Sequence, residues 1–231
     1  MASLNLHGGV DINGQPFDVE AAIKGLDASV IALQEAWTPA DGPDPVAIAA
    51  EALGAQMLRL PLRTIDGRSG PGATGMTVLS TVPVTDYAEL DLGQLRGDVV
   101  RRHAQIFTIE LPDRSALRLI STHLTHRLVS PIQLVRLIRH ISGRKLPTVI
   151  AGDLNMPRLF ASTAPGYTPA VRGRTWPAGL PTVQLDHILI SRGIERLDGR
   201  VLAATGSDHL PVRALLRLAP PGRPQPSAPG E

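Results

Sequence analysis

The chain has 231 residues, of which 43% are hydrophobic and 19% are charged, a formal net charge of +2, and no cysteine. This composition is typical of one globular α/β domain with a sizeable core, and it excludes disulfides, thiolate metal sites and cysteine nucleophiles. The charge balance lacks the strong positive bias that favours nucleic-acid binding, and no apolar run is long enough to span a bilayer.

The first third of the chain is predicted to alternate strands with helices. One helix is expected from Pro16 to about Leu26. A second is expected to begin at Asp44-Pro45 and to end at Gly54, because aspartate caps helix starts, proline suits the first turn and glycine closes helices. Apolar runs rich in β-branched residues predict strands near residues 2–6, 30–35, 56–60 and 75–80.

The remainder is predicted to hold one long helix among further strands. The helix is expected to begin at Ser130-Pro131 and to end at Gly143. Its stripe of Leu134, Val135, Ile138 and Ile141 should face the core, with Arg136, Arg139 and His140 in solvent. Strands are predicted near residues 84–90, 103–110, 117–122, 148–151, 185–190, 194–202 and 212–218. We expect one domain over residues 1–218 and a disordered proline-rich tail over 219–231.

Asp153 and Asn155 directly follow the predicted buried strand at 148–151. Because side chains alternate along a strand, both would point the same way wherever the chain stays extended. A carboxylate beside an amide suits a hard cation and a polarised water or phosphate. Taken alone, the pair is more typical of a simple turn.

Similar polar groups recur at other predicted strand ends, where each alone could be a strand-end cap. Open sheets bind ligands at one end of their strands, so we expect these groups to converge in space. The residues are Asn5, Glu35, His123, Asp186, Asp208 and His209.

In this order the segments resemble the endonuclease/exonuclease/phosphatase superfamily, which has the deoxyribonuclease I-like fold. The resemblance runs from about Asn5 to Leu218 and implies an α+β, four-layer sandwich of two packed mixed β-sheets flanked by helices. The matching segments are Leu4-Asn5-Leu6-His7, Leu33-Gln34-Glu35, Gly75-Met76-Thr77-Val78-Leu79-Ser80, Ser121-Thr122-His123-Leu124, Gly152-Asp153-Leu154-Asn155, Leu185-Asp186-His187-Ile188 and Ser207-Asp208-His209-Leu210-Pro211-Val212.

The resemblance also implies roles for these residues. Glu35 is the first choice for a divalent metal, Mg²⁺ or Mn²⁺, with Asn5 and Asp208 on the metal side. Asp186 would orient His209 and raise its basicity. His123 matches a position where the leaving group is protonated, and Asp153 would deprotonate or hold the attacking water.

Two residues are predicted to contact the substrate phosphate, Asn155 and Arg101. Arg102, Arg172 and Arg174 are further candidates, although any one arginine is more simply a solvated residue. Trp176 could form a wall of the substrate pocket or simply pack against its neighbours. His187 should point away from the site, and His126 reads as a loop residue. His7 stands where DNA-repair relatives carry an acid, which argues against that subgroup.

The predicted function is a divalent-metal-dependent hydrolase of phosphate esters, with a phosphodiesterase of endonuclease or exonuclease type as the leading subtype. The first alternative is a phosphatase or phospholipase-C-like enzyme that acts on a small phosphorylated or lipid head-group substrate. The second alternative is a non-catalytic binding module on the same fold. Every main position of the family's set is filled, which favours the enzyme. The predicted partner is a phosphate-ester substrate, with nucleic acid as one candidate. We expect a monomer without stable membrane insertion, in the cytoplasm unless a processed N-terminus once directed export.

Overall fold

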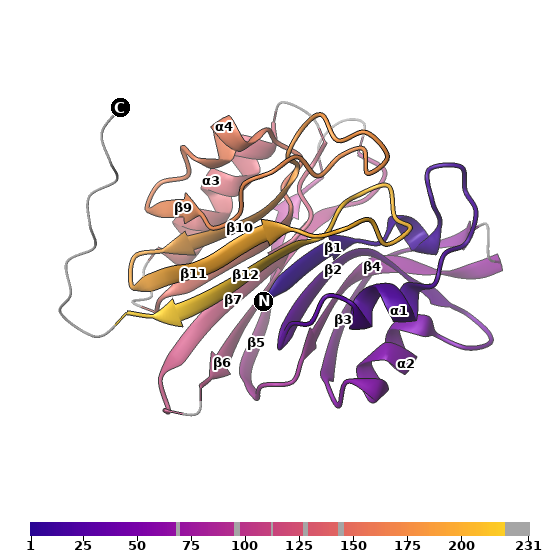
Figure 1. Cartoon of the computed structure of the whole chain (residues 1–231), viewed down its shortest axis with the longest axis horizontal. Helices are drawn as coiled ribbons and strands as arrows, with labels where there is room; N and C mark the ends of the chain where they lie inside the picture. Colours follow the sequence, from indigo (N-terminus) through magenta and orange to yellow (C-terminus); the bar gives the residue numbers. More distant parts are fainter. Residues whose placement is uncertain (68–69, 95–97, 112, 127–128, 143–145, 220–231) are drawn as a thin grey trace.

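Two six-stranded mixed β-sheets pack face to face, with helices on their outer faces (Figure 1). The computed structural model describes residues 1–67, 70–94, 98–111, 113–126, 129–142 and 146–219. The first sheet has the strand order β11 (Ile194–Val201), β12 (Val212–Leu218), β1 (Ala2–Asn5), β2 (Val30–Pro39), β4 (Gly70–Ser80) and β3 (Gln56–Gly67). The second has the order β5 (Val84–Gly93), β6 (Arg102–Glu110), β7 (Ala116–Thr122), β8 (Thr148–Asp153), β10 (Asp186–Ser191) and β9 (Tyr167–Pro169).

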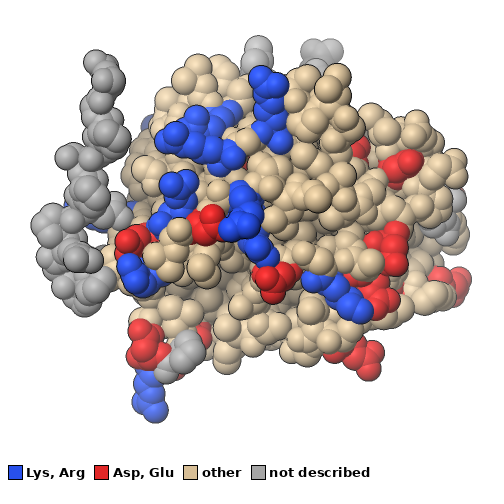
Figure 2. Space-filling view, in the orientation of Figure 1, with Lys and Arg blue, Asp and Glu red and all other residues tan. Residues whose placement is uncertain are grey.

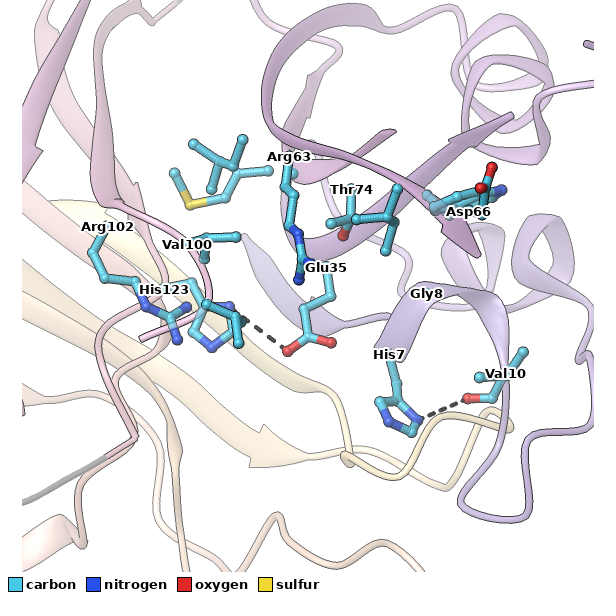
Figure 3. Close-up of a pocket in the computed structure, with 16 residues that line it drawn as sticks. His7, Gly8, Val10, Glu35, Arg63, Asp66, Thr74, Val100, Arg102 and His123 are labelled. Atoms are coloured by element: carbon cyan, nitrogen blue, oxygen red, sulfur yellow. Dashed lines mark hydrogen bonds and ion pairs between the residues drawn. The ribbon is translucent and has the colours of Figure 1, made fainter. Parts of the chain in front are cut away.

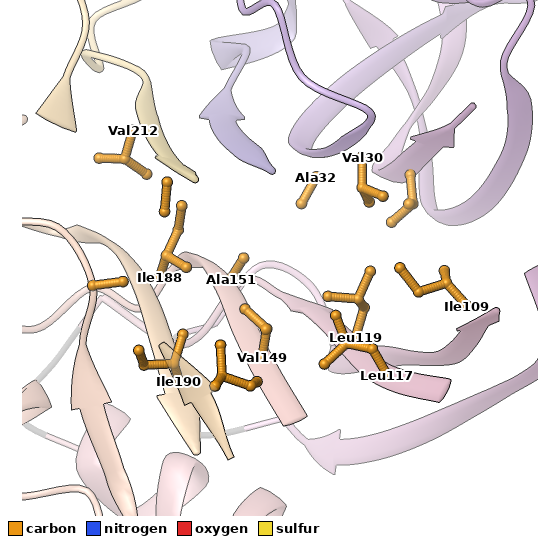
Figure 4. Close-up of a cluster of buried hydrophobic side chains, with 14 of the residues drawn as sticks. Val30, Ala32, Ile109, Leu117, Leu119, Val149, Ala151, Ile188, Ile190 and Val212 are labelled. Carbon is orange, nitrogen blue, oxygen red and sulfur yellow. The ribbon is translucent and has the colours of Figure 1, made fainter. Parts of the chain in front are cut away.

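The layers are held together by three apolar clusters. The central cluster lies between the sheets and joins Val30 and Ala32 of β2 to Leu119 of β7 and Val149 of β8 (Figure 4). A second cluster packs α3 (Ser130–Ile141) and α4 (Arg158–Ala161) on the outside of the second sheet. A third packs α1 (Val19–Lys24) and α2 (Pro45–Ala52) on the outside of the first. The predicted four-layer sandwich is confirmed.

The helix ends follow the capping residues of the sequence. Asp18 accepts a hydrogen bond from the backbone N–H of Ala21, so α1 begins at Val19, three residues after the expected start at Pro16. Asp44 accepts from the N–H groups of Val46 and Ala47, which starts α2 as predicted. Gly54 follows α2 with a φ of +60°, a conformation that favours glycine.

α3 begins at Ser130, as predicted, but Ser130 does not cap it. Val129 occupies the N-cap position, and Ser130 is already helical. The Ser130 hydroxyl instead donates to the carbonyl oxygen of Asn155 at 3.2 Å, so it links the helix to the loop after β8. Leu137 is fully buried, whereas Val135 is only half-buried. The predicted end at Gly143, like the tail from residue 220 onward, lies outside the described residues.

Some elements were not predicted or are longer than predicted. The β3–β4 hairpin extends well beyond 56–60 and 75–80, through the segment Gly70-Pro71-Gly72 that reads as a loop. The short elements α4, β9 and the 3₁₀ turn η1 (His7–Gly9) carry no periodicity that would reveal them. None of the described helices is long and apolar enough to cross a membrane.

Parallel pairing brings the predicted site residues to one edge of the molecule. β1 runs parallel to β2 in the first sheet, and β7 runs parallel to β8 in the second. β10 is antiparallel to β8, and its first residue, Asp186, pairs with Asp153 at the end of β8. The ends of β1, β7 and β8 and the start of β10 therefore meet between the two sheets.

Candidate active site

A buried group of two carboxylates and one imidazole forms the centre of the site. The Nδ1 atom of His209 lies 2.8 Å from Oδ2 of Asp186, and its Nε2 atom lies 3.8 Å from Oδ2 of Asp153. Asp186 is 0% exposed, Asp153 1% and His209 6%. One imidazole ring is thus held between two carboxylates that are almost out of contact with water. We call Asp153, Asp186 and His209 the buried triplet.

Hydrogen bonds between two hydroxyl side chains and the backbone hold the triplet in place. The Thr175 hydroxyl accepts from the backbone N–H groups of Leu185 and Asp186 at 3.0 and 3.2 Å, which fixes the start of β10. The Ser207 hydroxyl donates to the carbonyl oxygen of Asn5 at 2.6 Å and accepts from the N–H of His209. The serine of the Ser207-Asp208-His209 segment therefore ties the loop before β12 to the end of β1.

The charges of the triplet change its proton affinities. Burial by itself lowers the pKa of His209, but the charge and hydrogen bond of Asp186, with the charges of Asp153 and Asp208, outweigh it and raise the pKa to about 10. Burial and the nearby charge of Asp186 raise the pKa of Asp153 to about 7. The triplet therefore holds a protonated imidazole next to a carboxyl group that titrates near neutral pH.

Two amides surround Asp153. The Nδ2 group of Asn5 donates to Oδ2 of Asp153 at 3.1 Å, and the N–H of Asn155 donates to its Oδ1 at 2.9 Å. The Asn155 side chain donates to the carbonyl oxygen of Leu124 at 2.9 Å and lies 3.1 Å from Nε2 of His123. Asn155 has a φ of +50°, so a turn, and not continued extension of β8, brings it beside Asp153.

The glycine before Asp153 is required by close packing. A Cβ atom on Gly152 would lie 1.8 Å from the carbonyl oxygen of Thr122, and its φ is +147°. The backbones of β7 and β8 therefore approach more closely here than any other residue would allow. This approach brings His123, which follows β7, to within 3.5 Å of Asp153 through its Nε2 atom.

A cavity of about 440 Å³ lies beside the triplet and contains Glu35, Arg102 and His123 (Figure 3). The Glu35 side chain is 39% exposed, and its Oε1 lies 3.9 Å from Nδ1 of His123 and accepts from Nδ2 of Asn5 at 3.4 Å. Contrary to the sequence-based expectation, Glu35 does not end its strand. It sits at a bulge inside β2 with a φ of +48°, which turns its side chain into the cavity.

Burial, aided by nearby positive charge, lowers the pKa of His123. Burial, followed by the charges of Arg102, His209 and His126, holds the pKa of His123 well below its usual range. Arg102 is only 6% exposed and is influenced by the charges of Asp98, Glu35 and Asp153. A buried guanidinium beside a neutral imidazole makes this part of the cavity suited to an anion.

Arg101, predicted as a phosphate contact, lies elsewhere. Its guanidinium pairs with Asp91 at 2.7 Å, its side chain is 57% exposed, and it is not among the residues that line the cavity. Of the two adjacent arginines, only Arg102 is among the residues that line the cavity. The sequence identified both as candidates, but it could not tell which face of β6 would be inside.

Asp208 and Trp176 lie together at the border of the site. The indole N–H of Trp176 donates to Oδ2 of Asp208 at 3.2 Å, and Oδ1 of Asp208 is 3.7 Å from Nδ1 of His7. Trp176 therefore positions an acid as well as packing. Thr175, which sequence reasoning passed over, has no charge or spacing signal apart from its place beside Trp176.

His187 and His126 stay apart from the triplet. His187 is fully buried, and its Nε2 atom lies 2.9 Å from the carbonyl oxygen of Met156 on the other face of β10. His126 is exposed and lines a second cavity. The alternation of side chains along β10 therefore places His187 as expected.

The residues present fit a divalent metal. Glu35 offers a partly exposed carboxylate to the cavity, and carboxylate oxygens suit hard cations. The buried triplet offers a second donor set, whose ligand atoms all lie within 4.8 Å of one another. In addition, Oδ1 of Asp186 is buried without a hydrogen-bond partner among the described residues. His209 already occupies the other oxygen of Asp186, so Glu35 is the more accessible ligand.

Comparison with sequence families gives one match, which extends over nearly the whole chain. A family model described as the endonuclease/exonuclease/phosphatase family matches residues 2–209. A search of curated protein sequences gave no significant match.

Comparison with solved structures shows the same fold. An endonuclease/exonuclease/phosphatase protein from Beutenbergia cavernae superimposes with a TM-score of 0.73 at 22% identity, covering 94% of this chain and 70% of that one. The human Nocturnin catalytic domain with bound sulfate gives a TM-score of 0.69 at 17% identity, covering 95% of this chain and 93% of that one. A mannosyl-6-phosphatase from Bacteroides thetaiotaomicron gives a TM-score of 0.66 at 14% identity, covering 87% of this chain and 89% of that one. At these identities the likeness concerns the fold.

Proposed function

The chain belongs to the endonuclease/exonuclease/phosphatase family, a family of phosphoester hydrolases, and we propose that it is a divalent-metal-dependent phosphodiesterase that cleaves at the buried triplet. The single observation that carries this is the imidazole of His209 between two buried carboxylates, directly beside a cavity that holds a partly exposed glutamate and a buried arginine. Ester hydrolysis needs a proton acceptor for water and positive charge around the phosphoryl oxygens, and both are present.

Asp153 accepts the proton of the attacking water in this proposal. A general base is most effective when its pKa is close to the working pH, and burial with the charge of Asp186 raises the pKa of Asp153 to about 7. Asn5 and Asn155 donate hydrogen bonds to its two oxygens and so fix their direction.

His209 supplies positive charge beside the reacting phosphate. Its raised pKa keeps the imidazole protonated at neutral pH, and Asp186 holds the Nδ1 side so that Nε2 points toward Asp153. Arg102 adds a second cation from the cavity side. Asn155 would exchange its contact with His123 for a hydrogen bond to a phosphoryl oxygen when the ester binds.

His123 is assigned to the leaving-group side. Its depressed pKa makes the ring a neutral hydrogen-bond donor in the free protein, and not the ready proton source that the sequence suggested. Its contacts with Asp153 at 3.5 Å and Asn155 at 3.1 Å hold it against the same phosphate position.

Glu35 would hold the divalent metal, with Asn5 and Asp208 on the same side. A hard divalent ion at this position supplies neutralisation of charge on the phosphoryl oxygens. Mg²⁺ or Mn²⁺ is preferred over zinc because the donors are oxygen-rich and the chain has no cysteine.

A diester is favoured over a monoester because two cavities meet at the site. His123 lines the cavity of about 440 Å³, and Asn155 lines a second of about 730 Å³ together with Phe160. His123 and Asn155 are in contact, so a phosphate bound against this pair would have one cavity on each side for its two organic groups. On the face shown in Figure 2, basic and acidic side chains both occur with wide uncharged areas between them. The formal net charge of the whole chain is only +2, which favours a small ester over a long nucleic acid.

The test is a substrate panel with protein stripped by a chelator and then supplied with Mg²⁺ or Mn²⁺. We expect hydrolysis of bis(p-nitrophenyl) phosphate to disappear on stripping and to return with either ion, and to exceed hydrolysis of p-nitrophenyl phosphate. Full activity in excess chelator would contradict the metal. A reversed preference would favour the phosphatase.

Further substrates in the panel separate the remaining alternatives. Supercoiled plasmid and single-stranded nucleic acid test the nuclease subtype, and inositol phosphates and sphingomyelin test the phospholipase-C-like one. Binding of phosphate esters without turnover under every metal condition would favour a non-catalytic binding module.

A further inference from the structure

The cavity that holds Glu35 has an apolar wall that the phosphate chemistry does not use. Glu35, Arg102 and His123 lie at one end, where Figure 3 shows Arg102 and Glu35 on either side of His123. The wall comes from β2, β3, β4 and the segment before β6, and its apolar residues include Trp37, Leu62, Ile65, Met76, Val99 and Val100. Val99 is 72% exposed, so its side chain is available to a ligand in the cavity.

The backbone shapes this wall at Gly75. β2 bulges between Leu33 and Ala36, β3 bulges between Pro61 and Arg63, and both Ala36 and Pro61 pair with Gly75. A Cβ atom on Gly75 would lie 2.1 Å from the carbonyl oxygen of Leu60, so only glycine fits between the two bulged strands.

The paired bulges direct side chains from both neighbouring strands into one space. A bulge changes the direction of the side chains around it. Here Glu35 comes from the β2 bulge and Leu62 from the β3 bulge, and both line the same cavity. The metal-side acid and the apolar wall are therefore products of one local distortion.

We infer that this cavity binds the organic group of the ester and that its apolar wall favours an aromatic ring there. This inference rests on the phosphoesterase proposed above. A cavity of about 440 Å³ suits a small-molecule group, and the apolar side chains of the wall can cover the face of a ring, while Arg63, Asp66 and Thr74 line the same cavity and offer partners to polar groups on the ring. A phenyl ring and a nucleobase share the required chemistry, so both are tested.

The experiment measures binding without turnover, by calorimetry on the full chain with Mg²⁺. Phenylphosphonate and methylphosphonate carry the same anionic head, and their carbon–phosphorus bond is not an ester. We expect phenylphosphonate to bind about tenfold more tightly, because its ring is removed from water. Uridine 5′-monophosphate and ribose 5-phosphate form the second pair, which reports on the nucleobase; both are esters, so this pair is measured in chelator.

The variants are Val99→Ser and Leu62→Ser, singly and together, with Ile132→Ser as the matched control. Val99 is exposed and Leu62 is half-buried, so the fold should persist, and neither is placed in the catalytic machinery. Ile132 is 68% exposed on α3 and is not among the cavity residues. We expect the double variant to remove most of the phenyl preference while methylphosphonate binding stays within about twofold. Ile132→Ser should change neither.

If the double variant loses the ring preference in both ligand pairs, the cavity accepts either a phenyl ring or a nucleobase. If it loses the preference in the phenyl pair alone, the substrate is a non-nucleotide ester. Equal affinity of the wild-type chain for phenylphosphonate and methylphosphonate would overturn the inference. So would a phenyl preference that survives both serine substitutions, because the ring would then lie elsewhere. Hydrolysis of bis(p-nitrophenyl) phosphate by the same preparation reports separately on the proposed function.

Discussion

The buried triplet and the adjoining cavity meet at Asn5 but differ in nearly every physical property. Asp153, Asp186 and His209 are at most 6% exposed, and the pKa values of Asp153 and His209 are moved far from their usual range. Glu35 is 39% exposed in a cavity with apolar walls. Asn5 donates to Asp153 on one side and to Glu35 on the other.

The difference in burial separates proton transfer, in the triplet, from the binding of a cation and an organic group, in the cavity. Groups that move protons gain from burial, because a low dielectric shifts their pKa values and fixes their orientation. Groups that take up a cation or an organic ligand must remain accessible. Substitutions in the triplet should therefore act on kcat, whereas substitutions in the cavity should act on KM or on the metal requirement.

The largest expected effect is the loss of the Asp186–His209 pair. His209→Ala and Asp186→Asn should each lower kcat by roughly 10²–10⁴, the usual worth of a positioned acid or base. The double variant should lose little more, because residues that act as a unit are not additive. Steady-state kinetics on all three variants checks this, and losses that multiply would show that the two residues act independently.

The choice of control needs care, because His187 is unsuitable. Its ring is fully buried and contacts the Met156 carbonyl, so removing it would damage the fold although it points away from the site. His140 on α3 is exposed, and His140→Ala should leave both activity and stability unchanged.

Glu35→Gln should raise the metal requirement. An amide is a weaker ligand than a carboxylate, so the Mg²⁺ concentration for half-maximal activity should rise by roughly tenfold or more. A Mg²⁺ titration of activity measures this directly. If the buried triplet were the metal site, the half-maximal concentration would stay near the wild-type value.

Substitutions at the two adjacent arginines should differ in their effect on KM by about one order of magnitude. Arg102→Lys keeps the charge but loses the planar guanidinium, and it should raise KM about tenfold. Arg101→Met should change KM less than about twofold, because Arg101 is exposed and pairs with Asp91. The opposite ranking would return the phosphate contact to Arg101.

The smallest effect concerns stability. Because the pKa of Asp153 is raised to about 7 in the folded chain, the folded state binds a proton that the unfolded state releases, and stability falls as pH rises from about 4 to 7. In chelator at pH 8, Asp153→Asn should therefore be roughly 1 kcal/mol more stable than the wild type. The gain should shrink toward pH 4, while activity is lost at every pH. Urea unfolding at both pH values measures it, and a constant difference would contradict the raised pKa.

The sequence by itself determined the elements and the inventory of polar groups. Asp44 before Pro45 fixed a helix start, because that carboxylate can cap free N–H groups wherever the helix lies. The β-branched run before Gly152 fixed a strand, and the order of motifs fixed the fold family. These signals are local, so no tertiary contact was needed to interpret them.

Only the tertiary structure decided which groups face one another. Strand alternation permits either Arg101 or Arg102 to face the cavity, and the packing of β6 selected Arg102. In the sequence Glu35 is predicted to end a strand. The direction of its side chain comes instead from the bulges in β2 and β3 that flank Gly75 in the sheet. Glu35 and Gly75 are 40 residues apart in the sequence, so no local pattern reveals this arrangement. The pKa shifts of Asp153 and His209 arise from burial and from Asp186, and neither burial nor a distance between charges is encoded in a local pattern.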